Sequence, residues 1–139
     1  MLYIGIDTGV NTGLAVWDSL KRKLVELSTV KIHKAMERVA QLSVSDDIAV
    51  YFEDARQRKW IPQDPTYSRM KGRLQGAGSV KRDATIWEDF LKDLGVEYHA
   101  IAPKNNATKM NADFFAKVTG WAGKTSEHAR DAAMLVFNR

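Results

Sequence analysis

The sequence of 139 residues contains no cysteine, only three prolines and no apolar run approaching the length of a membrane span. The absence of cysteine excludes a disulfide framework and suits a reducing compartment. The first residues lack the basic stretch of a secretory signal peptide, and an acid already stands at Asp7. We therefore expect a cytoplasmic protein that does not associate with membranes. With no internal repeat, the length predicts one domain over residues 1–139.

Positive charge is concentrated in one part of the chain. The formal net charge is +4, and eight basic residues lie in the stretch 54–82 against two acidic ones: Arg56, Arg58, Lys59, Arg69, Lys71, Arg73, Lys81 and Arg82. Such a block beside acidic residues is typical of a protein that binds a polyanion, and Trp60 adds an aromatic surface on which a base can stack. The alternative interpretation is a solvated loop whose charge aids solubility.

Apolar periodicity predicts an α/β protein. We expect strands at 2–7, 14–18, 24–30, 48–52 and 96–101, and helices at 33–42, 79–94, 108–118 and 126–137. Residues 54–74, with two prolines and no clear period, are expected to form a mobile loop, and Gly76 and Gly78 are expected to precede the long helix. A three-strand meander followed by a crossover places the fourth strand parallel to the first and beside it.

Three carboxylates are then expected at one edge of the sheet. Asp7 and Glu53 end neighbouring strands at their carboxyl ends, and Asp131 lies on the last helix. A buried, unpaired carboxylate is costly, so such groups are paired or bind a metal. Each acid alone has a simpler interpretation, because Asp7 can cap the turn at 9–13 and Glu53 can pair with Arg56. Three acids at one crevice favour a divalent-metal site.

The ligand types indicate which metal to expect. Carboxylate-rich sites prefer hard cations such as Mg²⁺ or Mn²⁺. Two such ions about 4 Å apart can activate a water and stabilise the leaving oxygen of a phosphodiester. His128 shares a helix face with Asp131, and Glu127 is an alternative fourth ligand.

These motifs together resemble RuvC-type Holliday-junction resolvases. The resemblance is carried by Ile-Gly-Ile-Asp-Thr-Gly at 4–9, Thr-Gly-Leu-Ala-Val at 12–16, Phe-Glu at 52–53, Gly-Ala-Gly at 76–78 and His-Ala-Arg-Asp-Ala-Ala at 128–133. It spans nearly the whole chain and implies an RNase H-like fold, a mixed five-stranded sheet flanked by helices.

The resemblance also implies an activity. The family works as a homodimer that resolves four-way DNA junctions by paired nicks on opposed strands, with Mg²⁺ (Mn²⁺ able to substitute), two ions per site and no organic cofactor. The catalytic and metal-binding residues would be Asp7, Glu53, His128 and Asp131, and the helix at 79–94 would supply much of the dimer interface. The basic residue after the fifth strand would be Lys104 or Lys109.

This chain departs from the family in two respects. It is compact, as members from phages and other mobile elements are. The family tends to place an aromatic wedge soon after the glutamate of the fourth strand, whereas here Arg56 stands third after Glu53 and the first aromatic is Trp60. The wedge and any cleavage-sequence preference are therefore open.

Three other interpretations compete. YqgF-type nucleases, which share the fold and act on RNA, usually continue the fourth strand into a Gly-x-Pro loop, but Phe-Glu-Asp stands here at 52–54. Actin-like ATPases share the Asp-Thr-Gly at 7–9, yet they need two such domains, which 139 residues do not provide. A catalytically inactive DNA-binding relative is disfavoured because all four positions of the site are filled.

Overall fold

The structure is a computed structural model that describes residues 1–58, 66–103 and 109–139. Five strands form one mixed sheet in the order β3-β2-β1-β4-β5. The bounds are β1 Leu2–Asp7, β2 Asn11–Asp18, β3 Lys23–Lys31, β4 Ile48–Glu53 and β5 Glu97–Ile101. The first three strands are antiparallel neighbours, and β4 is parallel to both β1 and β5. The predicted meander and crossover are confirmed.

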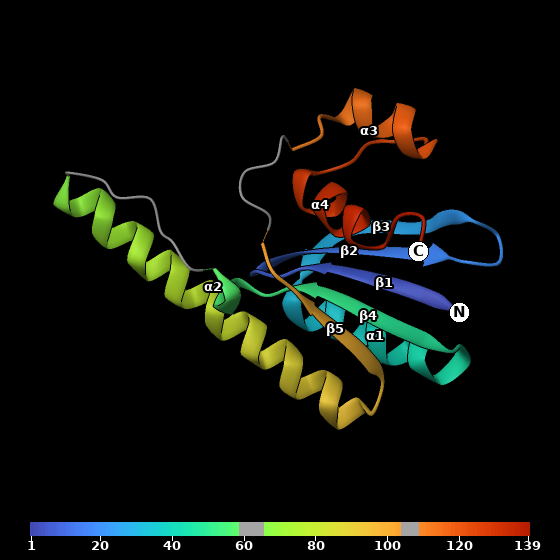
Figure 1. Ribbon diagram of the computed structural model, residues 1–139, viewed down its shortest axis with the longest axis horizontal. Coiled ribbons are helices and arrows are strands. Elements are labelled where there is room, and N and C mark those ends of the chain that lie inside the picture. The colour runs from blue at the N-terminus through green and yellow to red at the C-terminus, as the bar shows by residue number, and fades with distance from the viewer. Residues whose placement is uncertain (59–65, 104–108) are drawn as a thin grey trace.

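Helices cover both faces of the sheet (Figure 1). Their bounds are α1 Ile32–Ser45, α2 Tyr67–Leu94, α3 Ala112–Thr119 and α4 Glu127–Val136, with a short 3₁₀ turn, η1, at Ala55–Gln57. The helices α1 and α2 pack on one face, and α4 packs on the other, where α3 contributes Phe115 to the core. Within the described residues, none of these helices has the length and apolar character that crossing a membrane requires.

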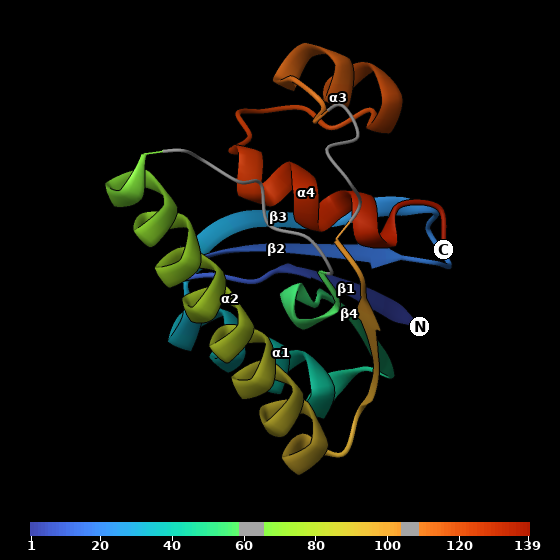
Figure 2. The same ribbon diagram turned by 60° about the vertical axis from the view of Figure 1, so that its left-hand side comes forward.

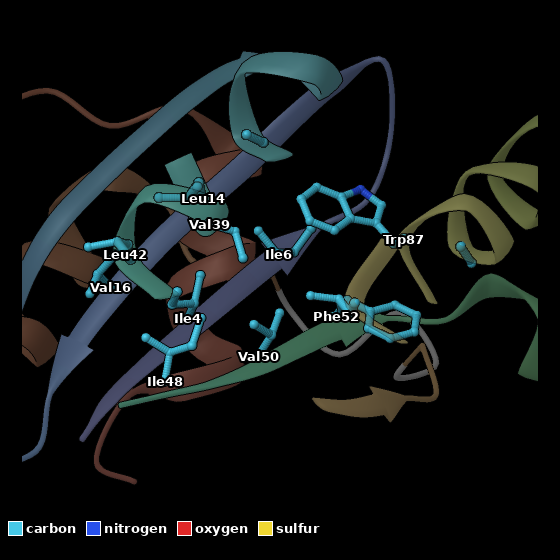
Figure 3. Close-up of a cluster of buried hydrophobic side chains, with 13 residues drawn as sticks. Ile4, Ile6, Leu14, Val16, Val39, Leu42, Ile48, Val50, Phe52 and Trp87 are labelled. Atoms are coloured by element: carbon cyan, nitrogen blue, oxygen red, sulfur yellow. The ribbon is translucent and has the colours of Figure 1, made fainter. Parts of the chain in front are cut away.

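The alternation of side chains along the strands divides the core into two layers. Ile4, Ile6, Val50 and Phe52 point toward α1 and α2, where they meet Trp87 in a buried cluster (Figure 3). The residues between them on β1 and β4 therefore face α4, and this layer includes Ala49 and Tyr51 of β4. The same alternation directs Asp7 and Glu53 toward the α4 side of the sheet.

The helix α4 lies unusually close to the sheet because two glycines leave room for it. A Cβ atom on Gly5 of β1 would overlap the carbonyl oxygen of Ala132, and a Cβ atom on Gly13 of β2 would overlap that of His128. The helix contributes a small-residue face that includes Ala129 and Ala132, both buried. Backbone therefore packs directly on backbone along α4.

One predicted boundary is wrong in an informative way. The helix α2 begins at Tyr67 rather than near residue 79, so residues 67–74 are helical and not a loop, and Gly76 and Gly78 lie inside the helix. A glycine costs a helix interior only about 1 kcal/mol relative to alanine. The buried side chains of Trp87 and Leu91 anchor the C-terminal half of α2, while its N-terminal half continues past the sheet (Figures 1 and 2).

Smaller shifts affect other elements. The strand β2 begins at Asn11 rather than residue 14, so part of the expected turn at 9–13 is strand. The helix α3 begins at Ala112, where the side chain of Asn111 accepts a hydrogen bond from the Phe114 amide at 2.8 Å. The prediction had this helix begin at residue 108; residues 109–111 are not helical, so that part is wrong, and residue 108 itself lies outside the described residues. Gly95 ends α2 in the left-handed conformation, which glycine adopts without strain.

Candidate active site

Pairing of β1 with β4 brings two of the predicted acids together. The register sets Ile6 beside Phe52, so Asp7 and Glu53 are the next residues on two adjacent parallel strands. The hydroxyl of Thr8 donates a hydrogen bond to the carbonyl oxygen of Glu53 at 3.1 Å, which ties the two strand ends together. Both carboxylates are thus held at the carboxyl edge of the sheet by backbone contacts.

The close approach of α4 adds the other two predicted residues. Nδ1 of His128 lies 2.8 Å from Oδ2 of Asp7, so the first turn of α4 directly contacts the end of β1. Asp131 follows one turn later, and its charge is close enough to raise the pKa of both Asp7 and Glu53. The start of the helix is fixed by Ser126, whose hydroxyl accepts a hydrogen bond from the Ala129 amide at 3.1 Å. Four residues from three elements therefore lie at one edge of the sheet.

The electrostatics of the site show concentrated negative charge. Burial raises the pKa of Asp7; its hydrogen bond with His128 opposes this, and the charge of Asp131 adds to the rise. Burial raises the pKa of Glu53 as well, and the neighbouring charges of Asp7 and Asp131 raise it further. Like charges and burial both disfavour the ionised forms. A cation placed among these carboxylates would relieve that strain.

Lys109 already supplies part of the compensating charge. Its ammonium lies 3.3 Å from Oδ2 of Asp131 and also pairs with Glu127. Glu127 therefore contacts Lys109, whereas His128 contacts Asp7, which separates the two candidates for the fourth ligand. The segment that carries Lys109 is held against α4, because Nε of Arg130 donates to the carbonyl oxygen of Met110 at 2.9 Å.

The donor set fits a hard divalent cation. Three carboxylates and one imidazole share one edge of the sheet, and oxygen ligands are those that Mg²⁺ and Mn²⁺ prefer. Among the described residues, no three acidic or histidine side chains converge as tightly as a metal shell requires. Asp7 contacts His128, and Asp131 contacts Lys109.

Arg56 is placed differently from the sequence prediction. Its guanidinium binds Asp54 (Nε to Oδ1, 2.8 Å) and Glu88 of α2 (Nη1 to Oε1, 3.2 Å). Among the described residues it therefore pairs with these two acids rather than with Glu53. Burial alone would raise the pKa of Asp54, but hydrogen bonds from Arg56 and Gln57 outweigh burial and hold that pKa below its usual value. Arg56 thus joins η1 to α2.

The other predicted DNA contacts follow the surface near α2. Six basic residues of the described chain are exposed there or close to the acids: Arg58, Arg69, Lys71, Arg73, Lys81 and Arg82. Lys109 is exposed too, on the opposite side of the acids. The predictions for Lys59, Trp60 and Lys104 lie outside the described residues. Arg69, Lys71 and Arg73 thus lie on the helix α2, where a loop was expected.

Two residues important for the geometry were missed in the sequence. Gly5 and Gly13 interrupt otherwise apolar strands, and a glycine inside a strand often marks close approach of another backbone. Both positions carry that signal in the sequence. Their partner is α4, far away in sequence, which only the packing identifies.

The sheet order and the flanking helices define an RNase H-like α/β fold, as expected. RuvC from Thermus thermophilus has a similar structure, with a TM-score of 0.52 and 17% sequence identity over 97% of this chain and 90% of that one. The cytoplasmic domain of EpsL, an inner membrane component of the type II secretion system of Vibrio cholerae, matches at a TM-score of 0.40, too low to support an argument. That match has 10% identity and covers 74% of this chain and 57% of the other. No protein-family model and no curated protein matches the sequence.

Proposed function

We propose that this chain is a metal-dependent, structure-selective endonuclease that cuts branched DNA, above all four-way junctions. The observation that carries the proposal is the meeting of Asp7, Glu53 and Asp131 at one edge of an RNase H-like sheet, beside a long basic helix. The acids would provide a site for the catalytic cations, and the helix would provide a surface that binds the DNA. A metal-dependent nuclease needs both features.

The proposed roles follow from the contacts. Asp7, Glu53 and Asp131, with His128, would hold two Mg²⁺ or Mn²⁺ ions. Such ions, when bound, activate a water and stabilise the charge on the leaving oxygen of a phosphodiester. Asp7 is central because it lies between Glu53 on the next strand and His128 on α4. Burial of Asp7 and Glu53 limits competing water, which strengthens their hold on a cation.

His128 and Lys109 would assist rather than replace the acids. The ring of His128 orients the carboxylate of Asp7 through the 2.8 Å contact. Lys109 restrains Asp131 and brings a positive charge to the side of the acids away from α2. A DNA phosphate entering between α2 and Lys109 would meet positive charge from both directions, which supports entry of the strand at this point.

The proposed assembly is a homodimer on a junction. A two-fold dimer presents two identical sites to two opposed strands. The helix α2 supports this, since Ile86 is 42% exposed and Leu74 is 51% exposed along its length. Phe90 of the same helix packs edge-on against Trp87, with ring centres 5.8 Å apart. Light scattering should give a dimer; a monomer of 15.7 kDa with and without DNA would contradict this part.

The decisive experiment is cleavage of end-labelled four-way junctions, flaps, forks and linear duplexes with Mg²⁺ and with a chelator. We expect symmetrical nicks on opposed strands of the junction, no cutting after chelation and little cutting of linear duplex. RNA hairpins belong in the same set, because selective cleavage of RNA would favour the YqgF-type alternative. An absence of metal-dependent cleavage of any of these substrates would refute the proposed nuclease.

A further inference from the structure

A cavity of about 470 Å³ lies beside Glu53, between the end of β4 and the middle of α2. Its apolar lining comes from Ala55 of η1 and from Gly76, Ala77 and Val80 of α2. These are small side chains or none, so the hollow exists because the helix has little bulk where it passes the strand end. The lining of Gly76 in particular is open, since a Cβ atom there would meet no other atom within 4 Å.

The polar lining of the cavity is almost entirely basic. Arg58, Arg73 and Lys81 line it from two elements, and the single acid among the described lining residues is Glu53. Arg58 is close enough to Glu53 to lower the pKa of that carboxyl, against the stronger effect of burial. The cavity thus joins an apolar floor to three basic residues and is lined on one side by Glu53 of the proposed active site.

This combination matches one ligand chemistry. Arginine and lysine side chains bind phosphate oxygens, and an apolar surface accepts the face of a base. The volume falls in the range of pockets that hold a single small ligand, far too small for a duplex. We propose that this cavity receives one unpaired nucleotide of the DNA strand, next to the phosphate that is cut. The proposal rests on the proposed nuclease function and specifies how its substrate is selected.

The consequence is a physical basis for preferring branched DNA. A nucleotide must leave its stack to enter the cavity, and this is least costly where the base is already unpaired or strained. The branch point of a junction offers such nucleotides, whereas a linear duplex does not. Selection then depends on the apolar floor, and the surrounding cations contribute affinity that is independent of structure.

Two glycines on the same helix give a matched pair of variants. Gly76→Leu would project a side chain into the cavity, while Gly78→Leu places the same side chain two residues later at a position that does not line it. Both glycines have open space at Cβ, and leucine favours a helix over glycine at each. Neither variant should unfold, and melting temperatures would confirm this.

The readout is a four-way junction carrying a fluorescent adenine analogue at the branch point, whose emission rises when it unstacks. Binding is measured with a chelator present, so no cleavage is needed. We expect emission to rise with wild type and with Gly78→Leu, and to stay at the free-DNA level with Gly76→Leu. With Mg²⁺, Gly76→Leu should cut the junction at least about tenfold more slowly, while Gly78→Leu matches wild type.

The outcomes separate this inference from the proposed function. If both variants unstack and cut like wild type, the cavity proposal is wrong and the nuclease stands. If wild type cuts nothing, but it unstacks the branch point and Gly76→Leu does not, the cavity binds an unpaired nucleotide and the proposed nuclease function fails. If free dAMP raises the melting temperature while the junction signal is absent, the cavity accepts free nucleotides and the proposal is overturned.

Discussion

Substituting Gly13 by alanine tests how the active site is assembled. This glycine touches no substrate in the proposal; it lies in β2, where the backbone of α4 passes over it. The added methyl group would overlap the carbonyl carbon and oxygen of His128 and crowd the amide of Ala129. All three contacts are backbone atoms of the first turn of α4, so no side-chain rotation can relieve them.

The expected magnitude follows from this geometry. Carbon atoms in contact prefer about 3.5–4.0 Å, so α4 must withdraw by roughly 1 Å or more at this point. Overpacking of this kind costs about 1–3 kcal/mol of folding free energy. For a chain of this size the melting temperature should fall by roughly 3–12 °C. The withdrawal would also carry His128 and Asp131 away from Asp7, and a misplacement of about 1 Å can cost a hundredfold in rate.

The assay combines thermal unfolding, junction binding and Mg²⁺-dependent cleavage on one preparation. We expect Gly13→Ala to remain folded at 25 °C, to bind junction DNA nearly as wild type does, and to lose about two orders of magnitude in cleavage. Gly78→Ala is the control, since its Cβ meets open space and should stabilise the helix by about 0.4–1 kcal/mol. Wild-type melting and cleavage in Gly13→Ala would refute the close approach of α4.

Three further predictions concern charged groups. Asp7→Asn should melt at the wild-type temperature or above, because the pKa of Asp7 is raised and ionisation of this carboxyl therefore destabilises the fold as pH rises. Its Mg²⁺-dependent cleavage should fall by several orders of magnitude. His128→Ala should have a smaller effect on both the melting temperature and the cleavage rate. Saturating Mg²⁺, at about 100 times its dissociation constant, should stabilise wild type by about 2.7 kcal/mol and Asp7→Asn by much less, as differential scanning calorimetry can measure. Arg56→Ala should lower the free energy of unfolding by about 1–3 kcal/mol, because it leaves the carboxylate of Asp54, which is 4% exposed, without its guanidinium partner. The guanidinium of Arg56 is itself partly exposed, and solvent screening keeps the cost from being larger. Because the pKa of Asp54 is lowered in the folded protein, its ionised carboxylate stabilises the fold above pH 3.8, and this stabilisation is lost as pH falls through the lowered pKa. Chemical denaturation should therefore show that the stability of Arg56→Ala depends less on acid pH than the stability of wild type does.

Much of the sheet was determined by local sequence. Alternating and continuous apolar runs predicted the five strands, and the lengths of their connections predicted the meander and the parallel crossover to β4. From these followed the pairing of Asp7 with Glu53 at one edge, because the register of two adjacent strands fixes which residues end together. The polar and glycine signals at the ends of α2 and α4 are also local: Gly95 ends α2 in the left-handed conformation, and Ser126 caps the start of α4.

Only the tertiary structure decided which partner each charged group takes. The sequence predicted that Arg56 contacts DNA, but in the structure its guanidinium binds the nearby Asp54 and also Glu88, which is more than 30 residues away along the chain. The sequence left Lys104 and Lys109 as alternatives; packing sets Lys109 beside Asp131, and Lys104 lies outside the described residues. Tertiary packing also decides that α2 extends N-terminally past Gly76 and that α4 packs closely on Gly5 and Gly13. Strands and turns depend on neighbours in sequence, whereas these contacts depend on which surfaces remain to be buried once the elements have formed.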